Sequence, residues 1–469
     1  MKTTAEERLA DLGAAVPLLL FPNKGIDLHK WAVIACDQGT QDRPYWEQAR
    51  SIAGEAPSAL NLIYPEVYLE EPGREKRIAD IHHSMNCYLK DDIFASPEKA
   101  LVYIERDTPY NQKRKGLLVA LDLEAYDWKA AIHNPPMIRP TEGTVPERLP
   151  PRMEIRRGAP LETPHILVLI DDEENFLFPA LSERANNQAA PFYNTELMLG
   201  GGCVRGWKLD KEDDWNVFAE GLEKLAKRAE EKYGIRRQEQ NGAQPFPFLY
   251  AVGDGNHSLA AAKGVWEEYK AAHQNDAEIM NHPSRWAMAE LVNLYDPALC
   301  FEPIHRLLMG ANSVVVQQAL AQLPGFRRCK PDSPQELASL VQDEQCGLLR
   351  LGLVSREQSA GRANLSCLLI EADPAPLAVD VIQPLLDKLI EEEKGKVIMD
   401  YIHGREELFR LAGSSENLHT TGILFPPFHK QGLFETIAKR GPLPRKSFSL
   451  GESCEKRYYL ECRELFGTF

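Results

Sequence analysis

The sequence predicts a mixed α/β fold, because strand patterns and helix patterns alternate along most of its length. Short apolar runs such as residues 248–252 and 165–170 stop at glycine or acidic residues, which is typical of buried strands. Residues 214–233 instead repeat apolar side chains at intervals of three and four, which is typical of an amphipathic helix. These patterns together favour sheets packed against helices.

In the first part of the chain the predicted elements follow one another in a simple order. Strands are expected at residues 31–35, 101–104, 116–123 and 165–170. The glycine triplet 200–202 predicts a hinge or a tight turn, and the helix over 214–233 is expected to end at Gly234. Residues 235–247 are predicted as a polar loop that leads into the strand 248–252.

A second α/β region is expected after about residue 310. Its strands are predicted at residues 347–354, 365–371, 397–401 and 421–425. A helix is expected over 377–393, and Pro384 must kink or divide it because proline lacks the amide hydrogen that a helix interior uses. The sequence therefore predicts two domains, residues 1–310 and 311–469.

Composition restricts the classes of partner. The net charge of −15 argues against a nucleic-acid groove or an anionic membrane surface as the main partner. No apolar run approaches the length of a membrane helix, and the nine scattered cysteines form no Cys-x-x-Cys pair. We therefore expect a cytoplasmic protein that binds a small-molecule substrate, without nucleic acid or membrane, and that can form a homodimer.

The segment 253–258, Gly-Asp-Gly-Asn-His-Ser, joins a predicted strand to a predicted helix. Its glycines permit backbone angles that other residues avoid, and the helix N-terminus points free N–H groups and a positive dipole end at an anion. The predicted phosphate-binding residues of this turn are Gly253, Gly255, Asn256 and Ser258. In the alternative interpretation Asp254 or Asn256 only caps the helix and His257 is a structural histidine.

Residues 138–152 are rich in arginine, glutamate and threonine, and a segment of this kind is not expected in a core. We predict a structured loop or one side of a pocket. Arg139 and Arg152 can bind phosphate oxygens in pairs, and Glu142 can act as a general base. The alternative is a surface loop with salt bridges.

Two further segments are candidates for the same site. His305 and Arg306 follow a predicted loop and can converge on an anion, or they can be surface residues. The acidic run 171–174 follows a strand end, where one carboxylate can hold magnesium or the run can be a solvated turn.

Taken together and in order, several short segments resemble domain-of-unknown-function family 1015 over nearly the whole chain. No single segment is specific, whereas the ordered set is. The segments are residues 31–37, 61–65, 139–142, 152, 164–165, 253–257, 303–306, 401–403 and 444–447. That family is in turn distantly similar to the ParB/sulfiredoxin-like superfamily, which includes a free serine kinase.

The resemblance implies a ParB/sulfiredoxin-like core in residues 1–310 and a phosphotransferase activity. In that superfamily an Asp-Gly-x-His-Arg turn cradles nucleotide phosphates, and Asp254, Gly255 and His257 match it. Ser258 stands where the pattern has arginine, which removes a fixed phosphate-binding cation, and Asn256 stands where a first histidine is common. Arginines elsewhere in the chain, such as Arg139, Arg152 or Arg306, are then the candidates to replace that cation.

The function predicted from these observations is a nucleotide-dependent phosphotransferase that acts on a small hydroxylated metabolite, serine- or phosphoserine-like. ADP or ATP is the expected phosphate donor, and Asp37 and Asp254 are expected to hold Mg²⁺. Glu142 or His257 would serve as general base beside Asp254. The alternatives are a non-catalytic regulator that binds a nucleotide or phosphorylated metabolite, and a nucleic-acid-binding protein, which the net charge disfavours.

Overall fold

The computed structural model describes residues 3–40, 42–111, 113–129, 135–234, 247–356, 365–414 and 419–466. The chain divides into two compact units. Unit 1 comprises Met1–Leu299, Ile437–Gly441 and Glu452–Phe469, and unit 2 comprises Cys300–Thr436 and Pro442–Gly451. The continuous domains 1–310 and 311–469 stay a prediction, but the units themselves show that the chain returns to unit 1 near its end.

Unit 1 is built on a large mixed sheet with the strand order β10-β11-β5-β6-β13-β9-β12-β7, and β1 pairs with β6 beside this path. Neighbouring strands are antiparallel except for the pairs β13–β9 and β12–β7, which are parallel. The strands are β1 (Ala14–Ala15), β5 (Leu101–Asp107), β6 (Arg114–Asp122), β7 (Ile138–Pro140), β9 (Ile166–Ile170), β10 (Tyr193–Leu197), β11 (Gly202–Leu209), β12 (Tyr250–Asp254) and β13 (Trp286–Asn293).

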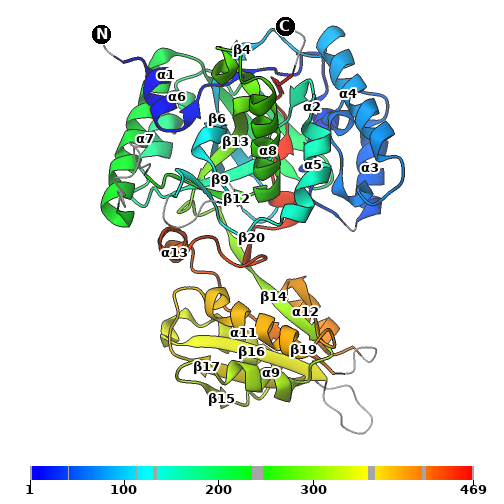
Figure 1. Ribbon diagram of the computed structural model, residues 1–469, viewed down its shortest axis with the longest axis vertical. Coiled ribbons are helices and arrows are strands. Elements are labelled where there is room, and N and C mark those ends of the chain that lie inside the picture. The colour runs from blue at the N-terminus through cyan, green and yellow to red at the C-terminus, as the bar shows by residue number, and fades with distance from the viewer. Residues whose placement is uncertain are drawn as a thin grey trace. The chain divides into compact units, whose positions relative to one another are not determined.

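Short strand pairs and helices complete unit 1 (Figure 1). The pairs are β2 (Leu18–Leu19) with β4 (Glu98–Lys99), β3 (Val33–Ile34) with β21 (Tyr458–Tyr459), and β8 (Leu161–Glu162) with β22 (Arg463–Glu464). The helices are α1 (Ala5–Asp11), α2 (Leu28–Trp31), α3 (Arg43–Ala53), α4 (Arg74–Lys90), α5 (Leu149–Arg156), α6 (Leu177–Asn186), α7 (Glu212–Tyr233) and α8 (Asn256–Ala272). No helix of the described residues is long and apolar enough to cross a membrane.

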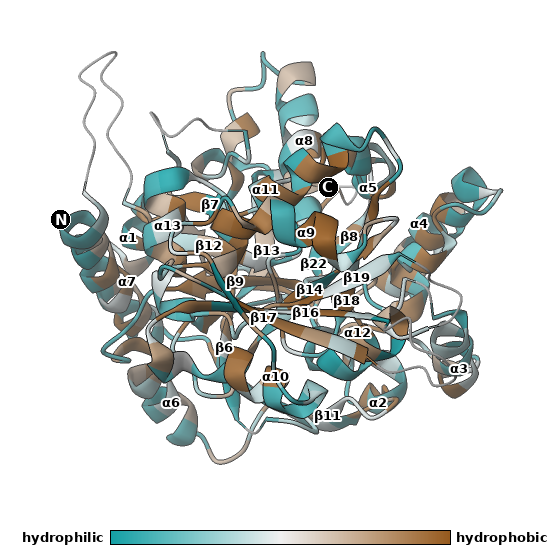
Figure 2. Cartoon of the chain, turned by 90° about the horizontal axis from the view of Figure 1, so that it is seen from below, coloured by the Kyte–Doolittle hydropathy of each residue, from teal (hydrophilic) through white to brown (hydrophobic). Residues whose placement is uncertain are grey.

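The large sheet has a hydrophobic core on each face, because successive side chains of a strand point to opposite faces. Leu101 and Tyr103 of β5 belong to the core that contains α7 and α8. Val102 and Ile104 alternate with these two residues along β5. They belong to the other core, which contains Trp31, Trp46 and strand β21 near the C-terminus. In Figure 2 many strands are coloured as hydrophobic, whereas the helices carry both hydrophilic and hydrophobic residues.

Unit 2 contains a second sheet with the order β15-β17-β16-β19-β14-β18, and β20 pairs with β14. All of its strand pairs are antiparallel. The strands are β14 (Phe301–Met309), β15 (Arg327–Cys329), β16 (Leu349–Arg356), β17 (Leu365–Ala372), β18 (Ile398–His403), β19 (Thr420–Leu424) and β20 (Phe448–Leu450). The helices are α9 (Ser313–Leu320), α10 (Pro334–Gln342), α11 (Ala378–Glu392) and α12 (Arg405–Ala412). The first residues of α13 (Leu433–Arg440) belong to unit 2, and its residues from Ile437 onward belong to unit 1.

The structure confirms the mixed α/β class and most predicted elements to within a few residues. The glycine triplet forms the tight turn between β10 and β11, where Gly200 and Gly202 have φ angles of 73° and 76°. Gly234 ends α7 as expected. The predicted polar loop lies, for residues 235–246, outside the described residues.

The structure differs from the predicted local structure at three places. Residues 31–35 are not one strand, because Asp27 caps a short helix that ends at Trp31 and the strand covers only Val33–Ile34. Helix α11 passes through Pro384 without division, whereas the expected alternative of a kink stays a prediction. Its buried apolar residues offset the proline penalty of about 3 kcal/mol, since burying one Leu or Ile contributes roughly 1.5–3 kcal/mol. The expected loop 138–152 contains the buried strand β7 and helix α5.

The C-terminal segment, residues 452–466, is held in unit 1 by buried ion pairs. Arg457 contacts the carboxylates of Glu290 in β13 and Glu461, and the three side chains are 3%, 2% and 0% exposed. Glu461 also accepts a hydrogen bond of 2.6 Å from the hydroxyl of Tyr193. Burial raises the pKa of Glu290, but Arg457 and Arg114 outweigh that effect and keep it below its ordinary value. The segment is drawn in red among the elements of unit 1 (Figure 1).

We expect the substitution Arg457→Met to lower the free energy of unfolding of unit 1 by about 3–5 kcal/mol, because the buried carboxylate of Glu461 loses the cation it contacts and Glu290 keeps only Arg114. All tryptophans of the chain lie in residues 1–299, so tryptophan fluorescence during urea denaturation reports on unit 1. The matched control is Arg157→Met at the exposed Arg157–Glu268 pair, where a loss below about 1 kcal/mol is expected. Equal losses in both variants would contradict the structural role of Arg457.

Candidate functional site

The turn between β12 and α8 has the geometry that the sequence indicates. Gly255 occupies the N-cap position with a φ of 80°, in the left-handed region that favours glycine, and a Cβ atom there would lie 3.0 Å from Ile166. No side chain caps the helix, so neither Asp254 nor Asn256 has the capping role of the alternative interpretation. The first N–H groups of this 17-residue helix therefore have no side-chain acceptor at the cap.

Ser258, in the first turn of α8, belongs to a chain of hydrogen bonds. Its Oγ lies 2.8 Å from Nε2 of His165, which directly precedes β9. Nδ1 of His165 lies 3.1 Å from the hydroxyl of Tyr459 in β21. That hydroxyl also accepts a hydrogen bond of 3.1 Å from the backbone N–H of Cys36. Three segments far apart in sequence thus meet at one imidazole.

Charged side chains surround this imidazole. Burial lowers the pKa of His165, the carboxylates of Asp37 and Asp254 raise it, and Arg152 and Arg457 lower it. Each of these charges must lie near the ring to affect it, because charge interactions across a protein fall off with distance. The structure therefore brings Asp37, Asp254 and Arg152 to the same region as Ser258.

Lys456 is the cation that sequence reasoning missed. Its Nζ lies 3.4 Å from Oδ2 of Asp254, and the two side chains are 7% and 21% exposed. The pairing of β21 with β3, with Tyr459 opposite Val33, brings the C-terminal segment to this position. One sequence feature could have indicated Lys456: the charged residues 455–457 directly precede two tyrosines, which is unusual for a surface tail.

Arg152, in α5, is already paired with a carboxylate. It contacts Glu66, and the two side chains are 14% and 15% exposed. Burial raises the pKa of Glu66, Arg152 lowers it, and Asp37 raises it. Asp37 itself accepts a hydrogen bond of 2.9 Å from the amide of Gln38. The carboxylates of Glu66 and Asp37 and the guanidinium of Arg152 are therefore close together.

The segment after β7 is tied to the turn. Thr141 donates a hydrogen bond of 2.7 Å to the carbonyl oxygen of Val252 in β12. The backbone N–H of Val145 donates to Nε2 of His257 at 3.2 Å, so this nitrogen acts as an acceptor. Glu142 lies between these two anchors and is partly buried. The loop that contains Glu142 is thereby held beside the end of β12.

Arg139 lies farther from the turn. Its register partner in β12 is Ala251, three residues before Asp254, which corresponds to about 10 Å along a strand. Its guanidinium stacks on the ring of Phe248 at 4.1 Å and donates a hydrogen bond of 2.9 Å to the carbonyl of Pro136. Burial lowers its pKa to about 10. These contacts place it at the beginning of β12 and not at its end.

His305 and Arg306 belong to the interior of unit 2. Arg306 is fully buried, donates a hydrogen bond of 2.9 Å to Gln383 and lies over the ring of Phe425 at 5.0 Å. Nδ1 of His305 accepts a hydrogen bond of 3.2 Å from the backbone N–H of Phe425. Both residues therefore have structural partners in the second sheet.

The acidic run 171–174 forms local contacts. Oδ2 of Asp172 accepts a hydrogen bond of 2.9 Å from the N–H of Leu177 at the start of α6. Asp171 and Glu173 lie 3.0 and 3.4 Å from the ammonium group of Lys232. Among the described residues no group of three or more His, Cys, Asp or Glu side chains is arranged to hold a metal ion.

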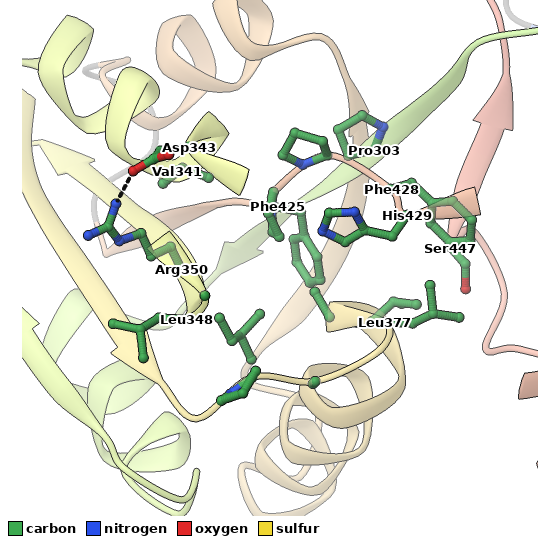
Figure 3. A pocket seen from close by; sticks show the side chains of 18 residues that line it. Pro303, Val341, Asp343, Leu348, Arg350, Leu377, Phe425, Phe428, His429 and Ser447 are labelled. Carbon is green, nitrogen blue, oxygen red and sulfur yellow. Dashed lines mark hydrogen bonds and ion pairs between the residues drawn. The ribbon is translucent and has the colours of Figure 1, made fainter. Parts of the chain in front are cut away.

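A cavity lies within unit 2 (Figure 3). It measures about 140 Å³, close to the size at which an apolar cavity binds one benzene-sized ring, and Phe425, Phe428 and Leu377 are among its lining residues. Its one arginine, Arg350, is already paired with Asp343 at 3.1 Å and with Glu371. The cluster in unit 1 includes the N-terminus of α8, which has no side-chain cap, and is therefore the better candidate for anion chemistry.

Comparison with known proteins identifies a family. The family described as "Protein of unknown function (DUF1015)" matches residues 20–365. Among curated proteins none matches the chain.

The chain also has distant likeness to solved structures. A mutant of free serine kinase in complex with AMP has 11% identity and a TM-score of 0.36, covering 76% of this chain and 94% of that chain. A mutant of the same kinase with ADP has 10% identity and a TM-score of 0.35, covering 74% and 91%. A conserved hypothetical protein from Pyrococcus furiosus has 11% identity and a TM-score of 0.31, covering 73% and 90%. Likeness this distant establishes neither a shared activity nor the predicted ParB/sulfiredoxin-like core.

The environment of His305 predicts a pH-dependent stability of unit 2. Burial, together with the neighbouring Arg306, His403 and Arg405, lowers the pKa of His305 to about 4. In the unfolded chain this histidine binds a proton at about pH 6.5. The contribution of the neutral, buried His305 to the stability of unit 2 is therefore complete above that pH and is lost as the pH falls towards 4. The loss expected over this range is roughly 3 kcal/mol.

Hydrogen exchange of the β14 and β19 amides at pH 7, 5.5 and 4.5 measures this effect after correction for intrinsic exchange rates. The substitution His305→Gln should reduce the change of stability with pH. The substitution His429→Gln, at an exposed histidine of the same unit, should leave that change as in the wild type. An equal pH dependence in all three proteins would exclude His305 as the cause.

Proposed function

The chain belongs to the DUF1015 family, and we propose that this member is a nucleotide-dependent phosphotransferase acting on a small hydroxylated, serine- or phosphoserine-like metabolite. The observation that carries the proposal is the meeting of an uncapped helix N-terminus, the Ser258–His165 hydrogen bond and the carboxylates of Asp37 and Asp254. Phosphoryl transfer depends mainly on positioning and on charge stabilisation, which groups of this kind provide.

Phosphate binding is assigned to the first turn of α8. Gly253 and Gly255 let the backbone approach the anion closely, and the N–H groups of Asn256 and its successors are directed along the helix axis. Oδ1 of Asn256 is buried, and no described residue donates a hydrogen bond to it. A hydroxyl or amino group of a bound ligand would supply that donor.

The cation that the family pattern places at position 258 must come from another residue. Lys456 and Arg152 are the candidates: Lys456 lies 3.4 Å from Asp254, and Arg152 lowers the pKa of His165. Arg139 and Arg306 are engaged by the rings of Phe248 and Phe425, which makes them weaker candidates than the sequence indicates.

Glu142 is the preferred general base of the proposal. Nε2 of His257 already accepts a hydrogen bond from the backbone of Val145, so this nitrogen can take a proton only if that bond breaks. The carboxylate of Glu142 lies in the loop that the same bond anchors. His257 then acts mainly by holding the loop in place.

Mg²⁺ and ADP or ATP are the cofactors of the proposal. Asp37 and Asp254 act on the same imidazole, and magnesium uses one or two carboxylates together with substrate phosphates, so the donor set fits this ion. A bound ion would neutralise charge that develops on the transferred phosphoryl group. Lys456 would exchange its contact with Asp254 for a phosphate oxygen.

The second candidate function is a regulator that binds a nucleotide or phosphorylated metabolite without turnover. It is favoured by the serine at position 258 and by the pairing of both nearby cations with carboxylates. Calorimetry with ADP and ATP, combined with analysis of the products, separates the two functions.

The proposal is tested by phosphate exchange between labelled nucleotides and serine. Asp254→Asn and His257→Gln should each lower the rate, Asp254→Asn by about 10²–10³-fold if its charge is organised for the transition state. Asp276→Asn, at an exposed carboxylate beyond the other end of α8, is the matched control and should retain full activity. Unchanged rates in both site variants would sink the assignment, and binding without exchange would favour the regulator.

A further inference from the structure

The structure places a hydroxyl group where a phosphoryl group would bind. Ser258 is the third residue of α8 and is partly exposed, and it lies beside the N–H groups of the first turn. A hydroxyl in this position lies within the reach of an anion held by the helix N-terminus. We propose, on the premise of the phosphotransferase function, that Ser258 is a nucleophile that carries the phosphoryl group covalently from nucleotide to acceptor.

The partner of Ser258 is suited to the role of a base. His165 lies 2.8 Å from Oγ, within the range for direct proton transfer. Burial lowers the pKa of His165, which keeps the ring neutral at physiological pH and leaves one nitrogen free to accept a proton. The structure therefore pairs a nucleophile with an unprotonated base.

Tyr459 orients that base. Its hydroxyl lies 3.1 Å from Nδ1 of His165, and it is held in place by the backbone N–H of Cys36 and by burial, since the side chain is only 1% exposed. A phenol oxygen has two lone pairs, so it can accept both the Cys36 N–H and a proton on Nδ1. In this tautomer Nε2 is the acceptor for the Ser258 hydroxyl. Nucleophile, base and orienting group then form the arrangement that activates serine in other enzymes.

The proposed step conserves atoms and charge. Oγ of Ser258 attacks the terminal phosphorus of ADP or ATP, and an Oγ–P bond forms as the bond from that phosphorus to the bridging oxygen breaks. AMP or ADP leaves with the electron pair, and the hydroxyl proton passes to Nε2 of His165. In the second step the acceptor hydroxyl attacks the phosphorus of the phosphoserine and gives its proton to the carboxylate of Glu142. The Oγ–P bond breaks, and His165 returns its proton to Oγ.

This inference gives a chemical reason for serine in place of arginine at position 258. A guanidinium there would bind the phosphate as a fixed cation, whereas a hydroxyl can form a bond to phosphorus. The cations then need only be nearby, as Lys456 and Arg152 are. Direct transfer would instead leave the Ser258–His165 bond without a chemical role.

The experiment uses the full-length protein with Mg²⁺ and with ADP labelled in its β-phosphate or ATP labelled in its γ-phosphate, first without an acceptor. After acid quenching, the bound label is counted and its position is found by mass spectrometry of peptides. Wild type and Ser84→Ala, at a serine of α4 whose hydroxyl donates to the backbone carbonyl of Asp80, should be labelled once per chain, whereas Ser258→Ala should carry no label. Phosphoserine is recognised by its stability in acid and its loss in alkali.

His165→Asn tests the base. The amide can keep a hydrogen bond to Ser258 but cannot accept a proton, so labelling should slow by about 10²–10⁴-fold while nucleotide affinity, measured by calorimetry, is retained. Tyr459→Phe should give a smaller decrease, because the base remains and only its orientation is lost. An unchanged labelling rate in His165→Asn would overturn the assignment of the base and the inference built on it.

The remaining outcomes separate this inference from the proposed function. Rapid transfer to serine by the wild type without any labelled enzyme, or full transfer by Ser258→Ala, would overturn the covalent route and leave the phosphotransferase standing. Absence of transfer by the wild type with both nucleotides would overturn the proposed function and the inference with it. Labelling confined to Ser258 and chased into product by added acceptor would support both.

Discussion

Unit 1 is organised around a buried ion network in which the guanidinium of Arg457 contacts the carboxylates of Glu290 and Glu461. Ions are costly to bury, so each must keep its partner, and the C-terminal segment is consequently fixed against β13 of the large sheet. The residues on either side of Arg457 are thereby positioned as well. Lys456 reaches Asp254, and Tyr459 reaches His165, two residues of the candidate site.

The site thus depends on two kinds of constraint. The direction of α8 is set locally, by the end of β12 and by a glycine that can adopt a φ of 80°. The side chains around the first turn of α8 are positioned by contacts between segments far apart in sequence. Strand β21 pairs with β3 and brings Cys36 and Asp37 beside Tyr459. Chemistry at Ser258 is possible only where both constraints act together.

Much of the fold was accessible from local patterns. Strands such as β9 and β12 and helices such as α7 repeat their apolar residues with the period of their own structure, and this period is visible in any short window. The turn 253–258 was accessible for the same reason. Strand β7 was not, because its arginine and proline suggest a loop and only pairing with β12 makes it a strand.

The sequence by itself determined the alternation of elements, the glycine turn and the set of polar residues available for phosphate chemistry. Tertiary structure decided which of them meet: it placed Arg306 in the interior of unit 2 and brought Lys456 to Asp254 and His165 to Ser258. The physical reason is that backbone angles and hydrophobic periodicity depend on neighbours in sequence. Ion pairs and hydrogen bonds between distant segments depend on which strands pair, and no short stretch of sequence specifies that pairing.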